Sequence, residues 1–192
     1  DDICIGTTIA NRTQTELEGM IGFFVNTLVL RSDMSNNPSF KELLSRVKQT
    51  TLESYDNQLA PFEKIVDRVV TTRDMSSTPI FQVMFSSENT SNSSEEQEET
   101  ETGLGNFVIS PYESDASVAA QFDLSLDVSE ENSIFELTLS YCTVLFKEET
   151  IVRILEQYQE LLTNIIENIE QPIGNLPILT KKQENQLLNT FN

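Results

Sequence analysis

Histidine and tryptophan are both absent from this sequence of 192 residues. A Ser-His-Asp or Cys-His catalytic centre within the chain is therefore excluded, because both need an imidazole as the base. Only two cysteines are present, Cys4 and Cys142, and their spacing does not suit a metal site. We expect two buried free thiols in a reducing cytoplasm, with a disulfide between them as the open alternative.

Basic residues are scarce. The 12 lysines and arginines stand against 31 acidic residues, giving a formal net charge of -19. Such a surface repels phosphate backbones, so we expect no nucleic-acid partner. No glycine-rich phosphate-binding motif is present either.

Long apolar runs are also missing. The longest, Met20–Leu30, is interrupted by Gly, Asn and Thr. No transmembrane helix fits this pattern and no signal peptide is visible, so we expect a cytoplasmic chain without a membrane partner. The chain begins on a strand-like run, which suggests a piece of a longer protein.

Five segments have strand-like patterns. They lie at residues 3–10, 24–31, 80–85, 122–128 and 135–141. The last two alternate strictly between apolar and polar residues and are joined by a polar link at 129–133, which predicts an antiparallel hairpin with one apolar face.

Helical spacing marks three further regions. Ser39 and Glu42 form a capping-box pattern before an amphipathic helix that reaches about Tyr55. Pro61 is placed to open a second helix, whose apolar face is predicted to carry Phe62, Ile65, Val66 and Val69. The longest stripe runs from residue 151 to 169, and Thr180 with Gln183 predicts a short final helix. These elements predict an α/β (α+β sandwich) architecture, a mixed sheet with helices packed against it.

The segment from residue 88 to 101 has no apolar residue and carries many glutamates. We interpret 88–105 as an acidic, solvated, flexible loop, with an acidic docking site as the weaker alternative. Ordered structure is expected to resume at Phe107–Ile109.

Four segments carry recognisable motifs. In chain order they read GTTIANR at 6–12, IGFFVNT at 21–27, NQLAPFE at 57–63 and RDMSSTPI at 73–80. They resemble GTxxAxR, [IV]GxFVNT, [HN]QDxPFE and RDxSxxPL, core motifs of the condensation domains of nonribosomal peptide synthetases. Leu59 departs from the family, which favours Asp there. Gln121–Leu124 also resembles the family's [KQ]FDL strand.

The resemblance implies a chloramphenicol-acetyltransferase-like fold of two lobes around a tunnel, where carrier-bound thioesters form a peptide bond. The family's catalytic HHxxxDG motif lies in the N-terminal lobe and has no counterpart here. The chain therefore resembles the C-terminal, acceptor-side lobe, at residues 1–174, followed at 175–192 by the start of a linker toward an adenylation domain. It would be inactive alone. Its implied partners are the N-terminal lobe, the adenylation domain and carrier domains that deliver phosphopantetheine, with no cofactor bound directly.

The same resemblance suggests which residues approach the tunnel. The candidates are Asn26, Gly6, Thr7, Ser86 and Glu88. Asn26 has an equally weighted alternative, in which its amide satisfies neighbouring backbone groups. For the residues from Ser86 to Glu88 the alternative is the start of a loop.

Other motif positions are assigned structural roles. They are Arg12, Gly22, Phe24, Pro61, Phe62, Glu63, Arg73, Asp74 and Pro79. Arg73 and Asp74 are expected to pair at a loop corner rather than bind substrate.

Two further functions stay open from the sequence. An epimerisation or heterocyclisation domain belongs to the same family, but epimerisation relatives favour a GWFT-like sequence where this chain has Gly22–Thr27. A degenerate, non-catalytic scaffolding module also fits the missing histidine. In the family a segment crosses between lobes, so Phe107–Ile109 or the next strand is expected to self-associate or be disordered.

Overall fold

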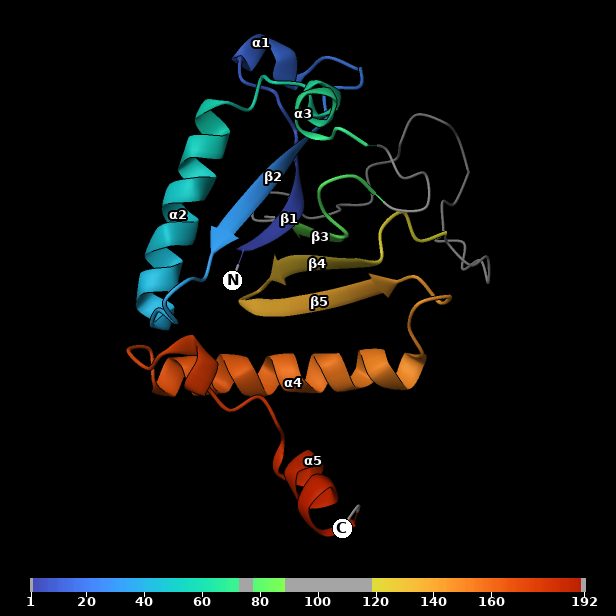
Figure 1. Cartoon of the computed structure of the whole chain (residues 1–192). Helices are drawn as coiled ribbons and strands as arrows, with labels where there is room; N and C mark the ends of the chain where they lie inside the picture. Colours follow the sequence, from blue (N-terminus) through green and yellow to red (C-terminus); the bar gives the residue numbers. More distant parts are fainter. Residues whose placement is uncertain (1, 73–77, 89–118, 191–192) are drawn as a thin grey trace.

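A computed structural model describes residues 2–72, 78–88 and 119–190 (Figure 1). Its centre is a five-stranded sheet in the order β2-β1-β3-β4-β5. The strands are β1 (Asp2–Ile9), β2 (Asn26–Asp33), β3 (Val83–Glu88), β4 (Leu124–Glu131) and β5 (Ile134–Tyr141). β1 pairs antiparallel with β2 and parallel with β3, β3 pairs parallel with β4, and β4 pairs antiparallel with β5. This confirms the predicted mixed sheet.

Helices surround the sheet (Figure 1). They are α1 (Thr15–Glu18), α2 (Phe40–Asp56), α3 (Phe62–Val69), α4 (Glu148–Glu167) and α5 (Lys181–Asn185), with the short turns η1 (Ile173–Asn175) and η2 (Gln186–Thr190). α2 packs along β2, and α3 lies near the start of the same strand. α4 runs below β5 in the view of Figure 1, and α5 extends beyond it toward the C-terminus.

Both predicted capping boxes are present. At the start of α2 the Ser39 hydroxyl accepts from the Glu42 N–H at 3.3 Å, and the Glu42 carboxylate accepts from the Ser39 N–H at 2.9 Å. Thr180 and Gln183 repeat the arrangement at α5. Such reciprocal bonds satisfy N–H groups that a helix start otherwise leaves unpaired.

Two predicted strand boundaries are wrong. Residue Ile80 has φ 74°, in the left-handed region that a β-branched residue rarely adopts, so the third strand begins at Val83 instead. The strand then continues to Glu88, paired with β4, so Ser86–Glu88 is strand and not a loop start. The hairpin link is also shorter than 129–133. Only Asn132 and Ser133 separate β4 from β5, at φ 51° and 63°, as a tight two-residue hairpin turn requires.

The two faces of the sheet differ, as the alternation predicts. One face carries half-buried apolar side chains, such as Leu126 and Leu139, which lie opposite one another in β4 and β5. The other carries Ser125 and Asp127 with their β5 partners Ser140 and Thr138. Side chains on neighbouring strands point to the same side when they are directly paired, so this second face is polar over β4 and β5. In β3 the residue paired with Ser125 is the buried Met84.

The buried apolar core of the described residues is small. Its members are Leu28, Val66, Phe81, Met84, Ile151, Ile165 and Leu176. Val69 is 63% exposed, so the predicted apolar face of α3 is correct for Val66 but wrong for Val69. Cys4 and Cys142 are unpaired as expected, but half-buried rather than buried.

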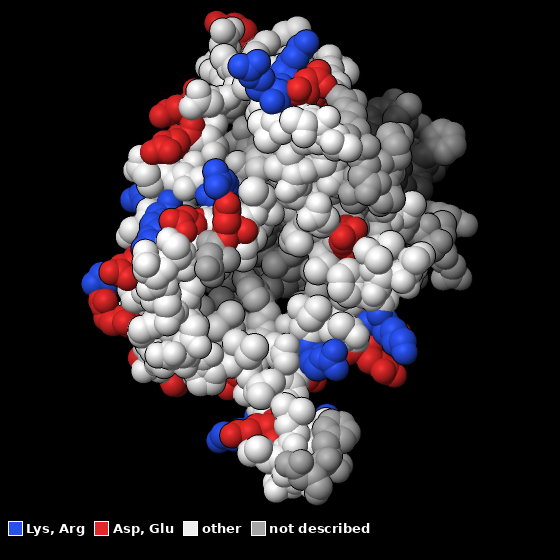
Figure 2. Space-filling view, in the orientation of Figure 1, with Lys and Arg blue, Asp and Glu red and all other residues white. Residues whose placement is uncertain are grey.

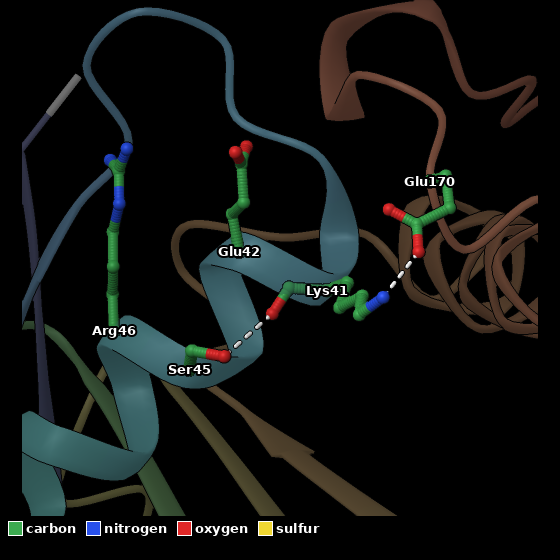
Figure 3. Close-up of a pocket in the computed structure, with 5 residues that line it drawn as sticks. All are labelled: Lys41, Glu42, Ser45, Arg46 and Glu170. Carbon is green, nitrogen blue, oxygen red and sulfur yellow. Dashed lines mark hydrogen bonds and ion pairs between the residues drawn. The ribbon is translucent and has the colours of Figure 1, made fainter.

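The C-terminal segment returns to the start of α2. Hydrogen bonds join the Ile173 N–H to the Pro38 carbonyl at 2.9 Å and the Gly174 N–H to the Asn37 side chain at 2.8 Å. Lys41 donates to Glu170 at 2.5 Å beside a shallow polar pocket (Figure 3). Residues 170–174 are thereby fixed to α2.

Candidate functional site

The side chain of Arg12 holds in place the motif segment at residues 21–25, which leads into β2. The guanidinium carbon of Arg12 lies 4.3 Å from the ring centroid of Phe24. Its Nη1 also donates to the backbone carbonyls of Leu17 and Glu18 at the end of α1. A cation over an aromatic face is worth roughly 0.5–1 kcal/mol at an exposed site. Arg12 therefore ties α1 to the segment that follows it.

Gly22 makes room for that ring. A Cβ at this position would lie 2.9 Å from the Phe24 ring. Such a contact is too close for carbon atoms, so any larger residue would displace Phe24 or the backbone. Phe24 is half-buried, whereas its neighbours Ile21 and Phe23 are exposed. The structural roles predicted for Arg12, Gly22 and Phe24 thus correspond to one local cluster.

Asn26, the first residue of β2, uses its whole side chain within the chain. Its Nδ2 donates to the carbonyls of Gln58 at 2.8 Å and Ala60 at 3.0 Å, and its Oδ1 accepts from the Phe62 N–H at 3.3 Å. These contacts fasten β2 to the turn before α3 and satisfy one of the free N–H groups of that helix. The alternative role considered for Asn26, in which its amide satisfies neighbouring backbone groups, requires hydrogen bonds of this kind.

Pro61 and Glu63 occupy the helix start expected of them. Pro61 is the residue immediately before α3, at φ −63°, and Glu63 lies in the first turn. A fixed φ and an acidic residue at the positive end of the helix dipole both favour initiation there.

Gly6 lies under an aromatic cluster. A Cβ on Gly6 would lie 2.2 Å from Cε2 of Phe81, which is only 1% exposed. Phe81 in turn packs on Phe62 and Phe122, with ring centroids 5.7 and 5.5 Å away. The close backbone approach predicted for Gly6 is therefore made by a side chain of this chain.

A groove of about 530 Å³ lies on the polar face of the sheet. Four strands contribute polar side chains to its lining, among them Thr8, Ser86, Ser125, Asp127 and Ser140. Met84, Leu139, Tyr141 and Thr143 also line it. Phe122, from the aromatic cluster, and Ala119–Gln121 close one side. Hydroxyls offer donors and acceptors and the carboxylate is an acceptor, so this surface can bind amide or amine groups.

Among the predicted tunnel residues whose side chains the structure describes, the groove gathers only one. Ser86 lines it, whereas Thr7 points to the opposite face of β1 and is half-buried there. Thr8, one residue later, is the β1 residue that the groove contains. The sequence prediction missed Thr8, Ser125 and Asp127, although the strict alternation of β4 already placed the last two on a polar face.

The remaining predicted positions lie at the edges of the described part of the chain or outside it. Glu88 ends β3 opposite Ser129, and its side chain is outside the described part of the chain. Arg73 and Asp74 lie outside the described residues, as do the acidic segment beyond Glu88 and Phe107–Ile109. Pro79 accepts a backbone bond from the Phe81 N–H at 3.0 Å.

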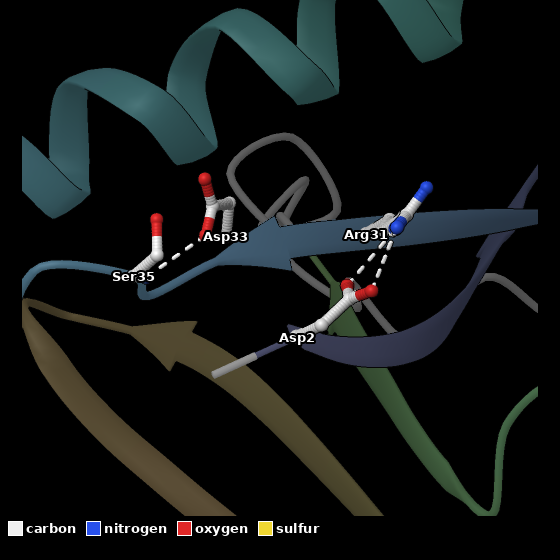
Figure 4. Close-up of polar contacts among 4 residues, drawn as sticks. All are labelled: Asp2, Arg31, Asp33 and Ser35. Carbon is white, nitrogen blue, oxygen red and sulfur yellow. Dashed lines mark hydrogen bonds and ion pairs between the residues drawn. The ribbon is translucent and has the colours of Figure 1, made fainter.

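Ion pairs lie away from the groove. Arg31 in β2 donates three hydrogen bonds of 2.7–3.0 Å to the carboxylate of Asp2 in β1 (Figure 4). These bonds lower the pKa of Asp2 and raise that of Arg31. Asp33 accepts from the Ser35 N–H at 2.8 Å, which lowers the pKa of Asp33. All are exposed pairs, so they are worth little to stability.

Charge is spread over the outside of the molecule. Figure 2 shows acidic and basic side chains interspersed along the side formed by α2, with few over the centre of the view. Within the described residues no group of three or more His, Cys, Asp or Glu side chains is placed to hold a metal ion. Among the described helices none is both long and apolar enough to cross a membrane.

Comparison with known sequences places the chain in one protein family. The sequence model described as the condensation domain matches residues 1–188. Gramicidin S synthase 2 from Brevibacillus brevis is 38% identical over 100% of this chain and 4% of its own length. Malpinin synthetase from Mortierella alpina is 40% identical over 100% of this chain and 2% of its own length. The chain thus spans a small part of these relatives.

Solved structures agree on the fold. The X-domain from teicoplanin biosynthesis superimposes with a TM-score of 0.78 at 25% identity, covering 93% of this chain and 40% of that one. A four-domain nonribosomal peptide synthetase bound to AMP and glycine gives a TM-score of 0.78 at 21% identity, covering 96% of this chain and 14% of that one. The condensation domain of a polyketide synthase also matches, at a TM-score of 0.65. The chloramphenicol-acetyltransferase-like fold expected from the motifs is that of these domains.

Proposed function

The chain belongs to the condensation domain family of nonribosomal peptide synthetases, and from this we propose that it is the C-terminal, acceptor-side lobe of a domain that forms peptide bonds. The observation that carries the proposal is a family match over residues 1–188 in a chain without histidine. The motif that supplies the family's histidine has no counterpart here, so the chain is inactive without the lobe that carries it. Its coverage of only 40% of the X-domain chain supports the same conclusion.

The polar groove is the surface best suited to the acceptor side. An acceptor thioester brings an amine and the amides of a phosphopantetheine arm, and both hydrogen-bond to hydroxyls and carboxylates. Ser86 and Asp127 lie on adjacent strands in direct register at this groove. We assign them to positioning of the acceptor, which places the amine near the donor carbonyl without taking part in proton transfer.

Asn26 and Gly6 act on that wall indirectly, through the aromatic cluster of Phe62, Phe81 and Phe122. Asn26 fixes the start of α3, and Phe62 from that helix packs on Phe81 over Gly6. Phe81 also contacts Phe122, which lines the groove. Their contribution to the reaction is therefore through the shape of the groove.

The partners follow from the position of this lobe in a synthetase. We propose that the lobe joins the N-terminal lobe of its own domain and receives phosphopantetheinylated carrier domains, with no cofactor held by the lobe itself. The segment after residue 174 leads toward an adenylation domain. Contacts that support the lobe continue a little past this boundary, since Leu176 is buried and Asn164 donates to the Pro177 carbonyl at 3.2 Å.

The reaction is tested with carrier domains loaded with donor and acceptor amino acids. The chain alone is expected to give no dipeptidyl product, and the intact condensation domain is expected to give it. Product from the chain alone would overturn the proposal. An intact domain that is folded, binds loaded carriers and gives no product would favour the scaffolding alternative.

The acceptor wall is tested by filling the groove. In the intact domain Ser86→Leu is expected to lower the rate of condensation at least tenfold by blocking acceptor placement, with little change in melting temperature. Thr163→Leu, on an exposed part of α4, is the matched control and should retain the rate. Equal rates of condensation for the two variants would show that the groove takes no part in the reaction.

A further inference from the structure

An exposed apolar surface precedes β2, on the turn between α1 and that strand. Ile21 is 104% exposed and Phe23 is 92% exposed, and Met20 and Val25 are about half exposed at 51% and 49%. We name these four residues the apolar knob. The stretch from Gly19 to Leu30 has no charged residue, so nothing in the knob itself favours contact with water. A cluster of large exposed apolar side chains is typical of a surface that meets another protein surface.

The knob is held in one shape. Phe24, between two knob residues, is half-buried beneath the Arg12 guanidinium, and Gly22 leaves space for its ring. Asn26 anchors the other end of the segment through three hydrogen bonds. A preorganised apolar surface loses little conformational entropy when it is covered, which favours specific docking.

The surroundings of the knob resemble the edge of an interface. Acidic Glu16 and Glu18 lie in the adjacent α1, and Arg12 lies beneath. An apolar centre with a charged rim is the usual composition of a protein interface.

We infer that the apolar knob docks into an apolar recess on the other lobe of the same condensation domain. This rests on the proposed function in one respect, the existence of that lobe. The other lobe is the partner we infer because of the match to the teicoplanin X-domain. That superposition includes 93% of the present chain but only 40% of the X-domain chain. A domain of this fold therefore contains a larger second part. Phe23 and Ile21, the most exposed knob residues, are the central contacts.

The experiment compares the same substitutions in two settings. Ile21→Ser with Phe23→Ser is introduced into this chain alone and into the intact condensation domain, and both melting temperatures are measured. In the chain alone the change is expected to be within about 1 °C, because both side chains are already exposed. In the intact domain the melting temperature is expected to fall by at least ~4 °C, because two buried apolar side chains are lost.

Ile166→Gln is the matched control. Ile166 is 82% exposed on α4, which in Figure 1 lies across the sheet from the segment between α1 and β2. It is expected to leave both melting temperatures unchanged. No change in the intact domain for the knob variant would overturn the inference, as would an equal fall in both settings. Sedimentation of the chain alone gives a further outcome: dimers abolished by the knob substitutions, with an unaffected intact domain, would assign the knob to a second copy instead.

A second measurement maps the contact directly. Phe23→p-benzoylphenylalanine in the intact domain is expected to crosslink, on irradiation, to apolar residues of the other lobe. Crosslinks only within this chain or between two domains would contradict the docking. Condensation activity of the unmodified domain is measured in parallel. An inactive domain with the expected crosslink refutes the proposed reaction alone, and an active domain without the crosslink refutes the docking alone.

Discussion

The two ends of the segment from Met20 to Thr27 differ in how their side chains are used. At the far end, Asn26 makes three hydrogen bonds within the chain, and every polar group of its amide has a partner. At the near end, Ile21 and Phe23 are almost completely exposed. A single motif therefore contains a part that is bonded within this chain and a part that is exposed on its surface. The same short sequence thus meets two different physical requirements.

The bonded end belongs to a larger unit. Asn26 holds the first N–H of α3, Phe62 of that helix packs on Phe81, and Phe81 covers Gly6 in β1. Substitutions in this unit should lower the stability of the chain alone, whereas substitutions in the knob should not. The following predictions test that division, from the largest expected effect to the smallest.

Gly6→Ala should be the most destabilising change. Its Cβ would lie 2.2 Å from the Phe81 ring, and Phe81 is 1% exposed and cannot move into solvent. Overpacking of this kind costs about 3 kcal/mol. Gly19→Ala is the matched control, since a Cβ there would meet no atom within 4 Å. Urea denaturation of both variants measures the difference, and equal midpoints would show that the Phe81 ring adjusts freely.

Asn26→Ala should rank second. The change leaves the carbonyls of Gln58 and Ala60 and the Phe62 N–H without their partner, at a cost of about 2 kcal/mol. Asn57→Ala removes one exposed bond to the Glu53 carbonyl and should cost well under half as much. Thermal unfolding of the two variants measures the difference between their losses of stability. A loss below about 0.5 kcal/mol for Asn26→Ala would make the tunnel role, rather than the backbone role, its main one.

Arg12→Lys should have a smaller effect, about 1 kcal/mol. Lysine keeps the charge but loses the planar group that stacks on Phe24 while donating to α1. Arg153→Lys on the exposed side of α4 serves as the control. Limited proteolysis between α1 and β2 should accelerate for Arg12→Lys alone. Unchanged cleavage would mean that the knob is held by Gly22 and Asn26 without Arg12.

Glu170→Gln should give the smallest change in stability. Lys41 donates to Glu170, which raises the pKa of Lys41 above its ordinary 10.5. Because the pKa of Lys41 is higher in the folded state than in the unfolded state, the pair stabilises the fold at pH values below the unfolded pKa. This stabilisation is lost as the pH rises through the folded pKa. Because the pair is exposed, the melting temperature at pH 7 should hardly change. A nitrogen NMR titration of Lys41 should show its pKa returning toward 10.5 in the variant; no shift would mean that the pair is not formed in solution.

Local chemistry made much of the fold predictable. The capping boxes at Ser39 and Thr180 depend on residues three apart, and the strict alternation in β4 and β5 reports the two faces of the sheet directly. The start of β3 was missed because Ile80 adopts a left-handed conformation that its residue type does not favour. The hairpin between β4 and β5 was predicted, but its link was taken to be too long because Asn-Ser lacks the glycine that usually marks a tight turn.

The candidate site was harder to predict because its contacts join distant parts of the chain. Asn26 meets residues more than thirty positions away, and sequence alone left its two roles equal. Ser86 was identified from a motif, but Thr8 and Asp127 share its groove only because β1, β3 and β4 lie side by side. Thr7, which the motif resemblance indicated, lies on the opposite face of β1 from the groove, because a one-residue difference in a strand reverses the face.

The position of β3 at the centre of the sheet also has a consequence for folding on the ribosome. Both neighbours of β3 are parallel to it and distant in sequence, one made long before it and the other long after. Pairings between distant segments form slowly, because a long loop must close before any contact is gained. A nascent chain that has β1, β2 and β3 but not yet β4 presents an open strand edge, which is prone to mispairing. Completion of this sheet during synthesis therefore depends on the arrival of β4.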